Sequence, residues 1–175
     1  MFRAASLIIA AAVLVSGCAP GEVPGGAMNQ PAHKPTITKA QALDRIEQLI
    51  NGTISVISPK PQVDLYKPSL IDDPCLGPLD GGSEDRIVVG REYHLRGLPK
   101  NEDALKRVLA DVKAYWEKEG HYISGQNESG LQLYAHSRPE DFLMAIGWAA
   151  DGVLTLGANS TCLWPNGTPE PSSAP

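Results

Sequence analysis

Cys18, placed directly behind a short apolar segment, constrains this chain more than any other residue. Residues 4–15 are apolar apart from one serine, and Arg3 precedes them with a positive charge. A run of this length is too short to span a bilayer, and its charged start, apolar centre and small residues before the cysteine are typical of an export signal. We therefore expect residues 1–17 to be a signal peptide, so that the folded part of the protein comes from the rest of the chain.

The residues around the expected cleavage site carry a resemblance. Val15-Ser16-Gly17-Cys18 resembles the lipobox of bacterial lipoproteins, in which the cysteine becomes the lipid-modified first residue of the mature protein. The resemblance implies a diacylglyceryl group on Cys18, and two acyl chains are enough for stable anchoring whereas one is marginal. It places the protein on the extracytoplasmic face of the cell membrane. The alternative is an ordinary secretory signal cut near small residues such as Ala10 and Ala12. Ala19, which is not Asp, favours the outer membrane if the cell has two.

The mature chain divides into three parts. Residues 18–36 comprise the lipidated cysteine and a segment rich in Pro and Gly without apolar periodicity, which predicts a flexible tether spanning about 25 Å on average. Residues 37–165 have the composition and length of one globular domain. Residues 166–175 are again Pro-rich and predict a disordered tail.

Charge limits the partners that such a domain can bind. Without residues 1–17 the chain keeps 14 of its 15 basic residues and all 20 acidic ones, a formal charge of about −6. Nucleic acid requires clustered Lys and Arg, so we expect no nucleic-acid partner. Anionic headgroups likewise find no polybasic segment, so the lipid on Cys18 must provide the contact with the membrane.

Two cysteines remain once Cys18 is acylated. Because an exported protein lives in an oxidising compartment, we expect Cys75 and Cys162 to form a disulfide. The bridge would close a loop of about 88 residues and contribute about 4.5 kcal/mol by the chain-entropy estimate. The alternative is a pair of buried free thiols.

Apolar spacing predicts two helices. The first begins near Thr38, which forms a capping box with Gln41, and ends at Asn51-Gly52. The second covers residues 101–119, with Asn101 as its cap and Gly120 as its end. Each carries one apolar stripe.

The remaining patterns predict strands and one long loop. Residues 53–57 are β-rich, and residues 62–85 lack periodicity and predict a loop tied down by Cys75. Further strands are predicted at 86–96, 121–124, 131–136, 142–149 and 153–158. In residues 142–149 large side chains alternate with small ones, which predicts helices on the face of the large ones. Asp151-Gly152 is typical of a hairpin turn. The fold class predicted is α+β, with two helices packed on one face of a mainly antiparallel sheet in a two-layer sandwich.

No pattern in the chain predicts catalysis, a cofactor or a metal site. The four histidines, His33, His94, His121 and His136, are not spaced as metal ligands. Three acidic pairs lie in predicted turns, and adjacency alone does not make a catalytic pair of carboxylates: Asp72 with Asp73, Glu84 with Asp85, and Glu140 with Asp141. Tyr134, Trp148 and Trp164 could line a groove, but core positions are the commoner use of such side chains. We therefore expect a protein that is not an enzyme.

The layout as a whole resembles a known family. A lipobox, a polar tether, a loop cysteine, a helix ending in Tyr115-Trp116, a hairpin and the late segment Ser160-Thr161-Cys162-Leu163-Trp164-Pro165 are similar to small actinobacterial lipoproteins of the mycobacterial LppA-like kind. That family has no assigned activity, so the resemblance implies a fold and a location. We expect a binding or accessory module that contacts an envelope protein or a wall component. The alternatives are an envelope hydrolase, a carrier of a small ligand or lipid, and an accessory to a sensor or transporter.

Overall fold

A computed structural model describes residues 36–70, 72–77, 83–149 and 152–168. The expected signal peptide, Cys18 and nearly all of the expected tether lie outside these residues, as do residues 169–175. Within the described part, neither helix is long and apolar enough to cross a membrane.

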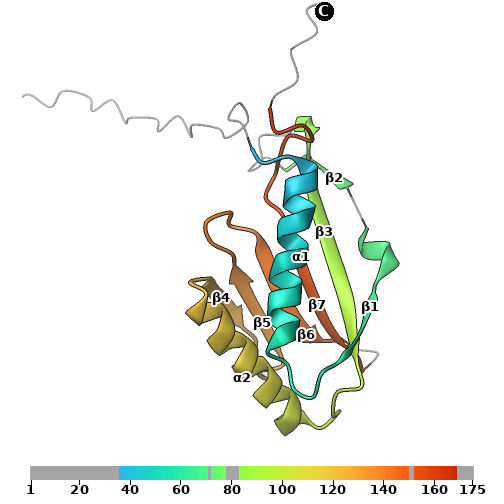
Figure 1. Ribbon diagram of the computed structural model, residues 1–175, viewed down its shortest axis with the longest axis vertical. Coiled ribbons are helices and arrows are strands. Elements are labelled where there is room, and N and C mark those ends of the chain that lie inside the picture. The colour runs from blue at the N-terminus through green and yellow to red at the C-terminus, as the bar shows by residue number, and fades with distance from the viewer. Residues whose placement is uncertain (1–35, 71, 78–82, 150–151, 169–175) are drawn as a thin grey trace, which may run out of the picture.

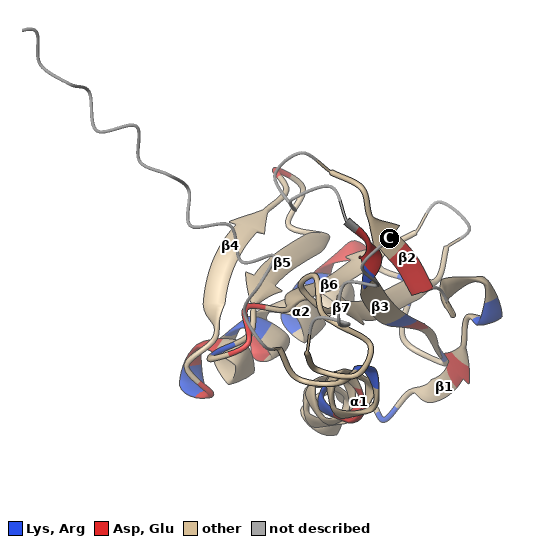
Figure 2. Ribbon diagram, turned by 90° about the horizontal axis from the view of Figure 1, so that it is seen from above, with Lys and Arg blue, Asp and Glu red and all other residues tan. Residues whose placement is uncertain are grey.

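The described chain forms one antiparallel sheet with two helices on one face (Figures 1 and 2). The strands follow the order β1-β3-β7-β6-β5-β4, and β2 also pairs with β3. This confirms the predicted α+β two-layer sandwich. Along the chain the elements are α1 (Lys39–Ser55), β1 (Gln62–Leu65), the 3-10 helix η2 (Lys67–Ser69), β2 (Asp72–Cys75), β3 (Ser83–Arg96), α2 (Glu102–Lys118), β4 (Tyr122–Gln126), β5 (Gln132–His136), β6 (Leu143–Trp148) and β7 (Leu154–Asn159).

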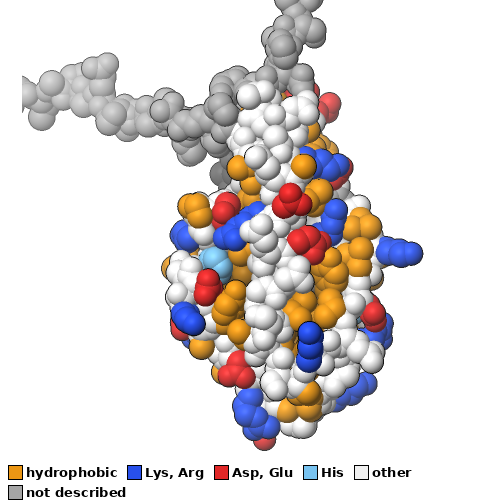
Figure 3. Space-filling model, viewed as in Figure 1, with side chains coloured by type: hydrophobic (Ala, Val, Ile, Leu, Met, Phe, Trp, Pro, Cys, Tyr) orange, Lys and Arg blue, Asp and Glu red, His pale blue; other side chains and the backbone are white. Residues whose placement is uncertain are grey.

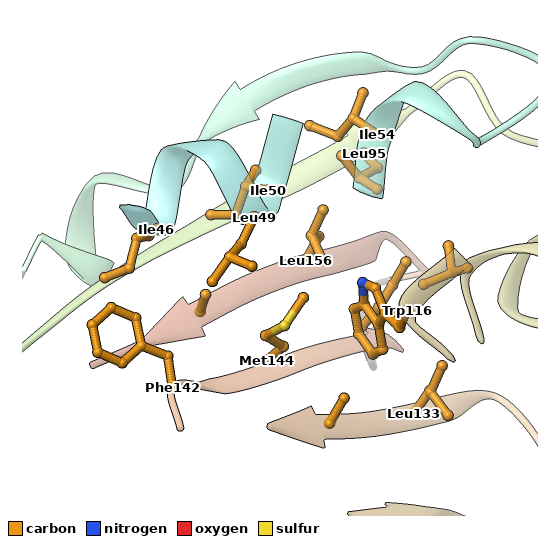
Figure 4. Close-up of a cluster of buried hydrophobic side chains, with 14 of the residues drawn as sticks. Ile46, Leu49, Ile50, Ile54, Leu95, Trp116, Leu133, Phe142, Met144 and Leu156 are labelled. Carbon is orange, nitrogen blue, oxygen red and sulfur yellow. The ribbon is translucent and has the colours of Figure 1, made fainter. Parts of the chain in front are cut away.

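The core lies between the helices and the sheet (Figure 4). Helix α1 packs on β3 and β7, and α2 packs on β4 and β5. The large side chains predicted to face the helices do so, because Phe142, Met144 and Ile146 are each about 1% exposed. Burying side chains of this size contributes roughly 1.5–3 kcal/mol each, which makes this interface the main source of stability.

Both predicted helix starts are confirmed, whereas the predicted end of the first helix is wrong. Thr38 and Gln41 form the capping box, and the Asn101 side chain accepts a hydrogen bond from the Ala104 amide. Helix α1 continues past Asn51-Gly52 to Ser55, so the strand predicted at 53–57 is not formed. The reason is tertiary. The continued helix places Ile54 in the core and allows the Thr53 hydroxyl to accept a hydrogen bond from the indole N–H of Trp116.

The described residues between 62 and 85 do not form the long loop that the sequence predicts. Strands β1 and β2 pair with β3, the 3-10 helix η2 contacts it, and β3 itself begins at Ser83. The acidic pairs Asp72-Asp73 and Glu84-Asp85 therefore lie in strands and not in turns. The apolar pattern is missing because β1 lies at the edge of the sheet, where all its side chains are exposed. The third acidic pair lies in a turn region as predicted, where Glu140 pairs with Arg45 at 3.0 Å.

The predicted cysteine pair is present at one end of the domain. A disulfide joins Cys75 in β2 to Cys162 after β7, with the two Cα atoms 6.1 Å apart. At the same end, the Thr36 amide donates to the Gly167 carbonyl over 2.8 Å. The described residues therefore continue beyond the predicted domain boundary at Pro165, and the first and last of them lie side by side (Figure 1).

Candidate functional site on the open face of the sheet

The alternation along each strand leaves the second face of the sheet without a helix. In β6, Leu143, Ala145 and Gly147 point away from the core. In β7 the same face carries Thr155, Gly157 and Asn159. We call this surface the open face. It lies opposite α1 and α2 (Figure 2).

Cross-strand register aligns the open-face residues into rows. One row runs Glu92–Gly157–Ala145–Tyr134 across β3, β7, β6 and β5. The neighbouring row runs His94–Thr155–Gly147–Gln132 across the same strands. In both rows the middle positions hold small side chains and the ends hold larger ones, although in the second row the Gln132 side chain folds over Gly147. The sheet therefore has a low floor between two higher sides.

This relief encloses a hollow of about 430 Å³. We call it the open-face hollow. Tyr66 borders it on the β1 side and Tyr134 on the β5 side, with exposed fractions of 40% and 39%. Tyr66 is held in place because its ring stacks on His94, with centroids 4.9 Å apart. Ser69 in η2 also accepts a hydrogen bond from the Glu92 amide and donates one to the Tyr66 carbonyl.

Glu92 places a negative charge in the open-face hollow. Its side chain is half-buried, and its carboxylate has no hydrogen-bond or ion-pair partner among the described residues. By contrast, Asp64 pairs with Arg96 over 2.6 Å. The Tyr134 hydroxyl donates to Gln132, which leaves the amide NH₂ of Gln132 as a donor.

Most groups with a shifted pKa lie between the sheet and the helices. Burial and a hydrogen bond to Glu47 of α1 raise the pKa of Tyr93 to about 12. Burial lowers the pKa of His121, and the positive charge of Arg45 lowers it further. The Nδ1 atom of His121 accepts a hydrogen bond from the Arg138 amide.

Two further groups with shifted pKa values belong to α2. Burial raises the pKa of Tyr115, and the negative charge of Glu119 raises it further. The other is Lys106 on the surface of α2, where a hydrogen bond to Glu102 raises its pKa. The helix-side surface carries charges of both signs (Figure 3).

The structure separates the residues that the sequence analysis considered together. Cys75 and Cys162 lie at the end of the domain where the described residues begin and finish, whereas Cys18 and His33 lie outside the described residues. Among the described residues, no group of three or more His, Cys, Asp or Glu side chains is placed to hold a metal ion.

The three aromatic residues divide between core and surface. Trp164 is 6% exposed, with the Arg86 guanidinium 6.0 Å from its ring centroid, and Trp148 packs partly against the core. Tyr134 alone of the three stands on the open face, where the core interpretation is wrong. Sequence reasoning also missed Tyr66 and Glu92. The sequence feature that could have indicated this site is the alternation of small and large residues in 143–149, which leaves mostly small side chains on one face of the strand.

Comparison with protein-family models, with curated proteins and with solved structures finds no match for this chain. The geometry is therefore the basis for any functional conclusion. A concave surface with aromatic borders and a few polar groups is the usual form of a site that binds a ligand.

Proposed function

We propose that the protein is a membrane-anchored bacterial lipoprotein that acts as a binding module of the cell envelope. Cys18 carries the lipid, residues 19–36 form the tether, and the domain binds an envelope protein or wall component. The lipobox and the resemblance to actinobacterial LppA-like lipoproteins support the location on the extracytoplasmic face of the cell membrane. The open-face hollow supports the binding role.

One observation supports the binding role: a hollow of about 430 Å³ lies on the face of the sheet that neither helix covers. The chain reaches this domain at Thr36, at the end that the disulfide holds. A flexible tether would leave the open face accessible in many orientations, which suits a partner presented at a surface.

A hydrolase is the second candidate, and the composition of the hollow favours binding over it. Glycoside hydrolysis uses two carboxyl groups about 5–10 Å apart. Among the described residues that line the hollow, Glu92 is the one carboxylate. A hydrolase of this kind would need a second carboxyl group beside Glu92, and the described residues that line the hollow provide none.

The anchor is tested by metabolic labelling with a palmitate analogue in the native host. We expect label on the wild-type protein and none on Cys18→Ser, which should leave the membrane fraction. An unlabelled wild type, or label that persists in Cys18→Ser, contradicts the anchor.

The binding surface is tested by site-specific photo-crosslinking in intact cells. A crosslinker at Leu143, which is 39% exposed on the open face, should capture one discrete envelope species. The matched control carries the crosslinker at Asp111, exposed on α2. Equal capture at both positions, or capture at Asp111 alone, contradicts the assignment of the open face.

A further inference from the structure

The carboxylate of Glu92 indicates what kind of ligand the open-face hollow takes. The Glu92 carboxylate is half-buried, and no described residue pairs with it, so its oxygens are available to a ligand. A ligand group that carries a positive charge and N–H donors would form a charge-assisted hydrogen bond with these oxygens. Tyr66 lies beside Glu92, since the Tyr66 amide donates a hydrogen bond to the Glu92 carbonyl. The face of a tyrosine ring also attracts a cation.

The floor of the hollow indicates the shape of the ligand body. Gly157 and Ala145 bring the ligand close to the backbone of the sheet, which suits a flat ring better than a branched side chain, whereas the Gln132 side chain covers Gly147. Between β3 and β5 the floor crosses three strand spacings, roughly 14 Å, which is enough for a short chain of rings. Tyr66 and Tyr134 stand at the two ends and offer apolar ring faces to C–H groups.

The polar groups around the floor distinguish a saccharide from a peptide. A peptide lying across the face of a sheet would leave its own N–H and C=O groups unpaired, because the ladder hydrogen bonds below are already made. A saccharide instead carries hydroxyls around its rings. The side-chain amides of Gln132 and Asn159 line the hollow and can both donate to such hydroxyls and accept from them.

We propose that the open-face hollow binds an amino sugar unit of an envelope glycan, with its free ammonium group on the Glu92 carboxylate and its rings over Ala145 and Gly157. This inference rests on the proposed function and names the ligand class of the same site. The negative charge of Glu92 and the positive charge of the ligand are complementary, and Arg91, the other charged residue that lines the hollow, has its guanidinium 4.0 Å from the carboxylate of Glu47 in α1.

The test is isothermal titration of the full mature protein in detergent with the trimer of glucosamine. We expect saturable binding that weakens at least tenfold for the N-acetylated trimer, because acetylation removes the charge, and that also weakens as salt is added. Glu92→Gln should weaken binding of the glucosamine trimer at least tenfold. Glu84→Gln removes the same charge from an exposed part of β3 outside the hollow and should leave binding unchanged.

A second variant keeps the test independent of Glu92. Ala145→Phe fills the floor of the hollow at an open-face position and should abolish binding while the urea midpoint stays close to that of the wild type. Absent binding of the glucosamine trimer, equal binding of both trimers, or unchanged binding by Glu92→Gln overturns the proposal. Tighter binding of tri-lysine than of the glucosamine trimer overturns its saccharide part. Crosslinking from Leu143 that persists alongside any of these results retains the binding face and rejects only this ligand class.

Discussion

Thr53 and Trp116 form a buried polar contact that ties the last turn of α1 to α2. Both residues have no exposed surface. The Trp116 indole N–H donates to the Thr53 hydroxyl over 2.8 Å, and that hydroxyl donates to the Leu49 carbonyl over 2.8 Å. The threonine thus satisfies the one polar atom that Trp116 brings into the core, and we predict that Thr53→Val destabilises the domain.

The size of the effect follows from what the substitution leaves behind. Valine has nearly the shape of threonine and a similar helix propensity, so packing and backbone change little. The indole N–H loses its partner inside the core, which costs about 1–3 kcal/mol. The new methyl group returns less than about 1 kcal/mol of hydrophobic burial. We therefore expect a net loss of about 1–2 kcal/mol in the free energy of unfolding.

Urea denaturation of a double-mutant cycle measures this contact directly. Thr53→Val should lower the midpoint without changing the slope. In a Trp116→Phe background, which has no indole N–H, Thr53→Val should cost at least about 1 kcal/mol less than in the wild type. If Thr53→Val is neutral or stabilising, or if the two substitutions are additive, the reasoning about this contact fails.

Three further predictions concern the disulfide and two titrating groups. Replacing both Cys75 and Cys162 by serine should cost up to about 4.5 kcal/mol of stability, measured by urea denaturation, and reductant should then have no further effect on the variant. The lowered pKa of His121 means that the folded state binds its proton more weakly than the unfolded state, so stability should be lost as pH falls below about 6.5, with a smaller loss in His121→Gln. Ultraviolet titration should show Tyr93 ionising near pH 12, and Glu47→Gln should lower that pKa; an unchanged value in the variant would contradict the role of the hydrogen bond.

The sequence predicts best the elements whose own residues repeat with the period of their structure. The caps at Thr38 and Asn101, the apolar stripes of both helices and the alternation in β6 all depend on neighbours within one segment. Asn51-Gly52 misleads because a local stop signal competes with the core contacts of Thr53 and Ile54, and the core contacts prevail.

The candidate site depends on long-range pairing, which no single segment reveals. Strand β1 has no buried side chain, so only its pairing with β3 identifies it as a strand. Glu92, Gly157, Ala145 and Tyr134 are ordinary alternating residues in four separate segments. They become one row only because the strand order places β7 and β6 between β3 and β5.

The central claim is that the tethered domain binds its partner through the open face. Hydroxyl-radical footprinting tests it by comparing oxidation rates in native membranes with those of the purified protein. We expect Tyr66 and Tyr134 on the open face to be protected in membranes, and Leu65, equally exposed but paired opposite Tyr93 on the helix side, to be unchanged. Protection of Leu65 with no protection of the two tyrosines would contradict the claim.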